Sequence, residues 1–190
     1  DDKAFTLCSL FWRKYYHDNH QRVAILGINP GRFGGGLTGI PFTDPLKLEK
    51  ICGIPNDLPK KAELSADFIH LMMAAYGGPG KFYSTYFFNS ISPLGFTQNG
   101  KNLNYYDTPE LQKSLEKFII QSLRQVLDLG VSQEKAFCLG EGQNFKYLLK
   151  VNEKEKLFKT VIPLAHPRFI MQYKRKFVND YVKDYLKKLT

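Results

Sequence analysis

The chain has 190 residues, a length that suits one domain over 1–190 with a single hydrophobic core. No apolar run approaches the roughly 18 residues that a membrane span requires, and no basic segment precedes an apolar one at the start. We therefore expect neither a membrane helix nor a signal peptide. Lys and Arg number 27 against 18 Asp and Glu, and this net charge of +9 favours a polyanionic partner, with plain solubility as the alternative.

The first half of the chain alternates helical and strand patterns. Apolar residues over 5–15 recur at helical spacing, and 22–27 is a short run typical of a buried strand. A loop rich in Gly and Pro follows over 29–45. The pattern then predicts a helix over 62–76 and, from aromatic and β-branched residues, a second strand over 81–91.

The second half repeats this alternation. Thr108 and Pro109 are typical of a helix start, and Gly130 of its end. We expect the later elements to be a strand over 135–140, a helix through 145–149, a strand over 160–165 and a basic helix over 169–189.

Strands that alternate with helices predict an α/β fold, here a three-layer α/β/α sandwich around a central, mostly parallel four-stranded sheet. Ligands of such sheets bind beyond the carboxyl ends of the strands. The distinctive loops, which contain Asn29, Ser90 and His166, all follow predicted strands. We therefore expect these loops to form one site.

The cysteines are widely spaced and form no metal-binding pattern. Cys8, Cys52 and Cys138 include no CxxC pair, which argues against zinc and against an iron–sulfur cluster. We expect free thiols in a reducing, intracellular compartment, which would be the cytoplasm or nucleoid of a bacterium. We expect no metal and no cofactor.

The first loop, 27–42, reads GINPGRFGGGLTGIPF. It resembles the first catalytic motif of the single-strand-selective monofunctional branch of the uracil-DNA glycosylase superfamily, roughly GMNPGPFGxxxTGVPF. The resemblance implies that Asn29 positions the hydrolytic water, that the backbone near Ile28 helps to hold this water, and that Phe42 stacks on an extruded base. The chemistry agrees, because an Asn amide can orient water but cannot ionise as a base.

The second loop departs from the family pattern. Residues 87–94 read FFNSISPL and resemble a base-reading strand end, roughly HNxCPL, in which the Asn pairs with the uracil edge. Register from Pro93 places Ser90 in that position, whereas residue identity favours Asn89. Adjacent strand residues face opposite sides, so only one of them can read the base. We favour Ser90, with Asn89 as the alternative; a serine reader would discriminate less tightly and admit hypoxanthine or xanthine.

The third loop begins with His166 and Pro167, like the second motif of the same branch. The resemblance implies that His166 donates a hydrogen bond to the base carbonyl as the glycosidic bond breaks, for which a neutral imidazole suffices. A DNA-intercalating residue follows in the family. Here Arg168 fills that role or binds phosphate, or else Phe169, Ile170 or Met171 acts as an apolar wedge. A basic group at Lys174, Arg175 and Lys176 is expected to face DNA phosphates.

Two departures from the high-activity branch predict substrate range and rate. That branch has an Asp where this chain has Asn29, so slower excision is expected here. It also has a Tyr where this chain has Gly31, so uracils substituted at C5 should be accepted. No lysine is placed to attack the sugar, which predicts glycosylase activity without lyase activity.

The resemblance thus implies a monomeric DNA glycosylase of base excision repair that acts on a flipped uracil or related base in single- or double-stranded DNA. Two alternatives stay open. One is a non-catalytic nucleic-acid-binding domain on the same fold. The other is a small-nucleotide hydrolase, for which Asp44 is the only carboxylate expected in the loops, too few for magnesium.

Overall fold

The computed structural model describes residues 2–190, and these form two compact units. The sheet unit comprises residues 19–32 and 85–164, and the helical unit comprises residues 2–18, 33–84 and 165–190. The expectation of a single domain over 1–190 stays a prediction. Within residues 2–190, no helix combines the length and the apolar character needed to cross a membrane.

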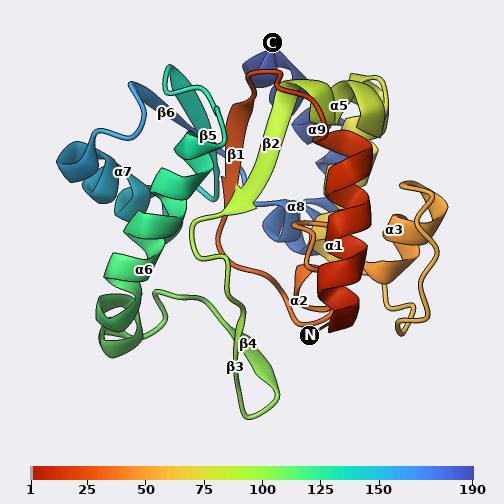
Figure 1. Cartoon of the computed structure of the whole chain (residues 1–190), viewed down its shortest axis with the longest axis horizontal. Coiled ribbons are helices and arrows are strands. Elements are labelled where there is room, and N and C mark those ends of the chain that lie inside the picture. The colour runs from red at the N-terminus through yellow and green to blue at the C-terminus, as the bar shows by residue number, and fades with distance from the viewer. Residues whose placement is uncertain (1) are drawn as a thin grey trace. The chain divides into compact units, whose positions relative to one another are not determined.

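The sheet unit is built on four parallel strands in the order β2-β1-β5-β6 (Figure 1). The strands are β1 (Val23–Gly27), β2 (Tyr86–Ser90), β5 (Lys135–Leu139) and β6 (Thr160–Leu164). The central strands β1 and β5 are almost wholly buried, as their continuous apolar sequences require. Two helices belong to this unit: α6 (Pro109–Asp128), capped by Thr108 as expected, and α7 (Gln143–Glu155).

The sequence interpretation missed a β-hairpin in the sheet unit. β3 (Phe96–Gln98) and β4 (Lys101–Leu103) are antiparallel and extend past the carboxyl end of β2 (Figure 1). Asn99 and Gly100 join them, with φ of 49° and 71°. Positive φ at both central residues defines the two-residue turn for which Asn-Gly is the strongest sequence signal.

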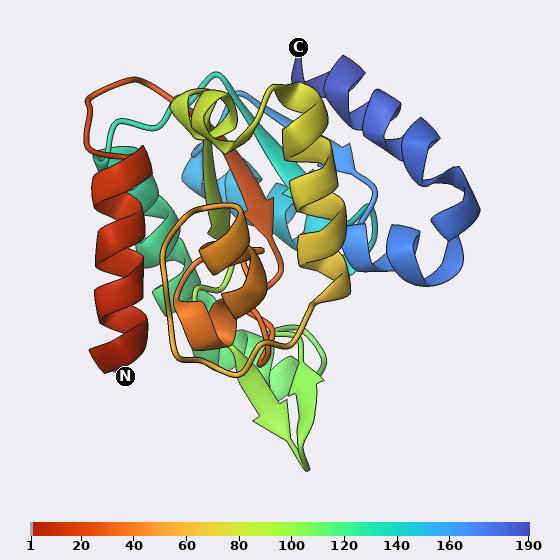
Figure 2. The ribbon, with the colours of Figure 1, turned by 90° about the vertical axis from the view of Figure 1, so that its right-hand side faces the viewer.

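The helical unit carries the remaining helices. They are α1 (Asp2–Tyr15), α2 (Gly35–Thr38), α3 (Pro45–Lys50), α4 (Leu64–Tyr76), α5 (Pro79–Thr85), α8 (Pro167–Tyr173), a 3₁₀ turn (Arg175–Phe177) and α9 (Val178–Leu189). Figure 2 shows α4 in yellow against α8 and α9 in blue. Phe68 of α4 packs edge-on against Tyr185 of α9, with ring centroids 4.9 Å apart. The packing of α4 against α8 and α9 anchors the chain immediately after His166.

Three predicted boundaries were wrong. The segment 81–91 is a strand only from Tyr86, because its first part belongs to α5, which buries Phe82 and Tyr83. The loop 29–45 contains the short helix α2. The basic final helix is split, because Lys174 has a non-helical backbone (φ −127°, ψ 22°) between α8 and the 3₁₀ turn.

Candidate active site

The first and second loops lie side by side at the carboxyl ends of β1 and β2. The amide of Ile91 donates to the carbonyl of Gly27 at 2.9 Å, and the amide of Ser92 donates to that of Ile28 at 3.0 Å. The loops thus continue the pairing of the two strands beyond the sheet. The structure therefore brings together two of the three predicted loops within the sheet unit.

Gly95 allows these loops to approach closely. A Cβ atom at this position would lie 2.6 Å from the carbonyl oxygen of Pro30, a backbone atom that cannot rotate away. We predict that Gly95→Ala displaces the Asn29 loop, costs about 1–3 kcal/mol of stability and slows excision. Denaturant unfolding and single-turnover rates test this. Gly142→Ala is the control, because a Cβ there meets nothing within 4 Å; equal effects of both changes would contradict the prediction.

The side chain of Asn29 is held by the chain that follows the hairpin. Its Nδ2 donates to the carbonyl of Leu103 at 3.0 Å, and its Oδ1 accepts from the amide of Tyr105 at 3.1 Å. These two bonds fix the orientation of the side-chain amide. If it were flipped, Nδ2 would face the N–H of Tyr105 and Oδ1 would face the carbonyl of Leu103, and neither bond could form. One lone pair of Oδ1 and one hydrogen of Nδ2 remain, so Asn29 can orient one further molecule.

The two candidate base readers differ in burial. Ser90 is 3% exposed, whereas Asn89 is partly exposed and its Oδ1 accepts from the amide of Ser90 at 2.8 Å. Ser90 pairs with Gly27 of β1, and Asn89 pairs with Leu26. Because the two residues are adjacent in β2, their side chains face opposite sides of the sheet. The choice between them stays a prediction.

In the helical unit, the end of the first motif is organised around Thr38. Its buried hydroxyl donates to the carbonyl of Thr43 at 2.7 Å and accepts from the amide of Ile40 at 3.1 Å. Phe42 lies inside this turn, partly exposed, with a φ of 53°. Left-handed backbone in a bulky residue is strained, and such strain is concentrated at functional sites. The hydrogen bonds of Thr38 therefore stabilise a backbone conformation at Phe42 that an unconstrained loop would leave.

His166 caps α8 through its own ring. Its Nδ1 accepts from the amide of Arg168 at 3.1 Å, so the single proton of the neutral ring belongs on Nε2. Burial and the charge of Arg168 lower the pKa of His166 to about 4. The imidazole is therefore neutral at physiological pH, with Nε2–H as its available donor.

The residues after His166 separate into exposed and buried ones. Arg168 and Phe169 are exposed, and the Phe169 ring lies 5.7 Å from that of the exposed Tyr173. Ile170 is fully buried, so its assignment as a possible apolar wedge was wrong. The basic group Lys174, Arg175 and Lys176 is exposed, and it lies in the break between α8 and α9.

The sequence interpretation missed a carboxylate beside the first motif. Glu63 Oε2 lies 1.9 Å from the place that a Cβ of Gly34 would occupy, so only glycine fits there with this side chain in place. Burial, followed by the charge of Asp44, raises the pKa of Glu63.

Asp44 itself is buried and caps α3: its carboxylate accepts from the amides of Lys47 and Glu63 and pairs with the Lys47 ammonium at 2.9 Å.

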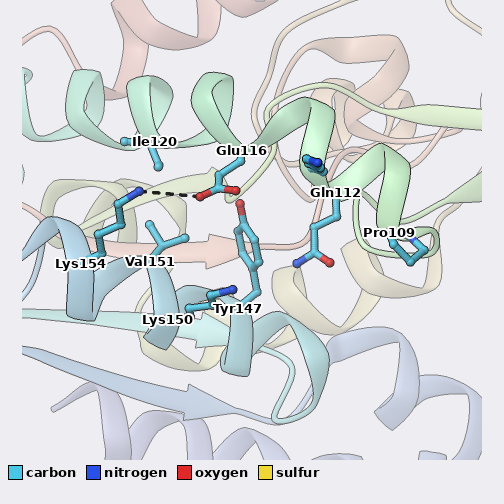
Figure 3. Close-up of a pocket in the computed structure, with 9 residues that line it drawn as sticks. Pro109, Gln112, Glu116, Ile120, Tyr147, Lys150, Val151 and Lys154 are labelled. Carbon is cyan, nitrogen blue, oxygen red and sulfur yellow. Dashed lines mark ion pairs between the residues drawn. The ribbon is translucent and has the colours of Figure 1, made fainter.

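A cavity of about 230 Å³ in the sheet unit lies between α6 and α7 (Figure 3). It is lined by polar and apolar side chains, among them Lys113, Lys150, Glu116 and Tyr147. Lys154 approaches Glu116 to 3.9 Å at its rim. None of the predicted site residues lines this cavity.

The chain thus combines a parallel sheet with an Asn-Pro-Gly loop after its first strand and a His-Pro pair that caps a helix after its last strand. The sequence profile of the uracil DNA glycosylase superfamily matches residues 13–190, and the chain belongs to this superfamily. Among solved structures, the chain is similar to wild-type SMUG2 from Pedobacter heparinus. The two are 46% identical over 99% of this chain and 82% of that chain, with a TM-score of 0.95.

This similarity confirms the SMUG-like branch that the His-Pro motif indicated. It also confirms the predicted fold class, an α/β fold with a four-stranded, all-parallel central sheet flanked by helices.

Proposed function

We propose that this protein is a monofunctional DNA glycosylase that hydrolyses the N-glycosidic bond of uracil in DNA during base excision repair. Membership of the superfamily and the similarity to SMUG2 support the activity and DNA as the substrate. The observation that carries the mechanism is the amide of Asn29, which is fixed at the end of β1 by two backbone hydrogen bonds.

In the proposed reaction, the free lone pair of Asn29 Oδ1 accepts a hydrogen bond from water and aims the water oxygen at C1′ of the sugar, while the backbone near Ile28 helps to hold that water. The new C–O bond forms as the bond from C1′ to the base nitrogen breaks. The electron pair leaves with the base and spreads onto its O2, where Nε2–H of His166 stabilises it. The proton lost by water goes to solvent.

The remaining predicted residues bind the substrate. Phe42 stacks on a base extruded from the DNA, an interaction worth on the order of 1–3 kcal/mol. Arg168, Phe169 and the basic group Lys174, Arg175 and Lys176 hold the strand. We propose that the protein acts as an intracellular monomer.

The test uses oligonucleotides that each carry one uracil, 5-hydroxymethyluracil, hypoxanthine or xanthine, in single- and double-stranded form. After incubation, hot alkali cleaves at any abasic site. We expect cleavage of the uracil strands only after alkali, and no product trapped by borohydride, because the enzyme has no lyase step. Binding of DNA without release of any base would favour a non-catalytic DNA-binding domain, and activity on free deoxyuridine alone would favour a nucleotide hydrolase.

Gly31 gives a prediction about substituted uracils. With no side chain at this position, the pocket should accept a hydroxymethyl group at C5. We predict that Gly31→Tyr reduces excision of 5-hydroxymethyluracil by at least about 100-fold while uracil excision falls less, because loss of a fitted contact or a clash costs a few kcal/mol. The ratio of the two rates is the measurement. A variant that retains the wild-type ratio would contradict the role of Gly31.

The base reader is tested by two adjacent alanine variants. If Ser90 reads the base, Ser90→Ala should lower kcat/KM for uracil by about tenfold, as expected for one lost hydrogen bond to the substrate, whereas Asn89→Ala should have little effect. Introducing the family residue with Ser90→Asn should favour uracil over hypoxanthine. The opposite pattern of the two alanine variants would assign the role to Asn89.

A further inference from the structure

We propose that Tyr105 and Asn144 are positioning residues for Asn29, and that they form a hydrogen-bonded support which sets the geometry of the water-orienting amide. This inference rests on the proposed function of Asn29. Neither residue belongs to a motif that the sequence singled out. The support lies entirely within the sheet unit.

The support starts at the carboxyl end of β5. Asn144, near the start of α7 and 2% exposed, donates from Nδ2 to the carbonyl of Leu139 at 3.0 Å and to Cys138 Sγ at 3.3 Å. Its Oδ1 is thereby left to accept from the Tyr105 hydroxyl at 2.9 Å. Each polar atom of the Asn144 amide thus has a partner, and its orientation is fixed.

Tyr105 carries this constraint to Asn29. Its side chain is fully buried, and its ring packs against those of Tyr106 and Tyr147 with centroids 4.9 and 5.0 Å away. Its backbone amide is the donor to Asn29 Oδ1. Burial raises the pKa of Tyr105, so the hydroxyl stays protonated and remains a donor to Asn144. The hydroxyl of Tyr105 is held by Asn144 and its ring by the neighbouring tyrosines. The backbone amide of the same residue, which donates to Asn29, is therefore held in place as well.

This support is needed because the chain around Tyr105 is otherwise a connection between the exposed hairpin and α6. Backbone in such a connection moves more than backbone in the sheet. A catalytic group must be held within about 0.5 Å of its productive position, and a small misplacement costs rate rather than binding. The Tyr105–Asn144 bond ties this connection to the end of a central strand.

The test compares two variants that each lose one phenolic hydroxyl from adjacent buried rings. Tyr105→Phe removes the bond to Asn144. Tyr147→Phe is the matched control, because the Tyr147 hydroxyl has no hydrogen-bond partner among residues 2–190, although the ring packs on Tyr105. We expect Tyr105→Phe and Asn144→Ala to slow single-turnover excision of uracil about fivefold to tenfold, and Tyr147→Phe to leave the rate within about twofold of wild type.

Two further readouts separate positioning from general destabilisation. The Kd for an oligonucleotide carrying an uncleavable 2′-fluoro-deoxyuridine should be unchanged in Tyr105→Phe. The side-chain amide signals of Asn29 in ¹⁵N NMR, identified by their loss in Asn29→Ala, should shift in Tyr105→Phe and stay in place in Tyr147→Phe. The inference is overturned if Tyr105→Phe matches wild type in rate or in these signals, or if both phenylalanine variants behave alike.

Failure of the proposed function would look different. In that case wild-type protein would release no base, whereas the NMR comparison would still report whether Tyr105 holds the Asn29 amide. If wild type excises uracil and Asn29→Ala does not, a wild-type rate in Tyr105→Phe refutes the positioning role alone.

Discussion

Replacement of Asn29 by alanine is expected to reduce the single-turnover rate of uracil excision by about 100- to 1000-fold, the usual effect of removing one preorganised group that acts on the transition state. Binding of uncleavable DNA should persist, since the substrate is held mainly through phosphate and stacking contacts. Quench-flow rates and fluorescence anisotropy provide the two measurements. Comparable losses of rate and affinity would mean that Asn29 serves binding rather than catalysis.

Asn152 provides a matched control for this variant. Like Asn29, it clamps a backbone segment with both ends of its amide: Nδ2 donates to the carbonyl of Phe158 at 2.8 Å, and Oδ1 accepts from the Phe158 amide at 2.7 Å. It lies in α7, within the same unit. Asn152→Ala should therefore lose similar stability in thermal unfolding but retain excision. If Asn152→Ala is equally inactive, the effect of Asn29→Ala reflects lost structure.

Replacement of His166 by alanine should slow excision by about 100-fold, because the charge that develops on the leaving base loses its hydrogen-bond donor. The same change removes the cap of α8, which alone costs about 1 kcal/mol of stability. His166→Ser separates the two effects, since serine restores a cap without an imidazole. Both variants should be equally slow, with the serine protein more stable. Recovery of the rate in His166→Ser would show that the cap, and not the imidazole, matters.

The pH dependence follows from the depressed pKa of His166, which is about 4 in the folded protein. Nε2–H is a donor in either protonation state, but protonation of Nδ1 breaks the bond from the Arg168 amide that orients the ring. Excision should therefore show no ordinary histidine titration near pH 6.5 and should fall only as pH falls through about 4. An unfolded histidine titrates near 6.5, so the unfolded state binds more protons between these values. The stability contributed by neutral His166 is therefore present above about pH 6.5 and is lost as pH falls towards 4.

His70 shifts stability in the same direction, because burial and the charge of Lys47 lower its pKa to about 4. Unfolding free energies measured from pH 7 to 4 should therefore decrease in wild type and decrease less steeply in His166→Ala. A decline of equal slope in the two proteins would indicate that His166 has the same pKa in the folded and the unfolded state.

Local patterns predicted most of the elements because they reflect short-range physics. α6 begins at Thr108 and Pro109 because the threonine caps the helix and the proline fixes φ at its first residue. β1 and β5 are continuous apolar runs because both strands are buried. In each case neighbouring residues in the sequence are enough to predict the element. The segment 81–91 was misread because aromatic residues suit both a strand and a buried helix face. Only packing shows that Phe82 and Tyr83 belong to α5. The Asn99-Gly100 turn, in contrast, has a local signal, because Asn-Gly favours the positive φ that both central residues adopt.

The sequence by itself determined the family, the parallel sheet and the loops that carry Asn29, Ser90 and His166, because motifs and strand ends are local. Only the tertiary structure decided what holds these side chains: Tyr105 is 76 residues from Asn29, and Asn144 lies 39 residues beyond Tyr105. It also decided that Ile170 is buried and that His166 Nδ1 is occupied. The physical reason is that hydrogen-bond partners and burial depend on which distant segments the fold brings together. The spacing of residues along the chain does not predict these contacts.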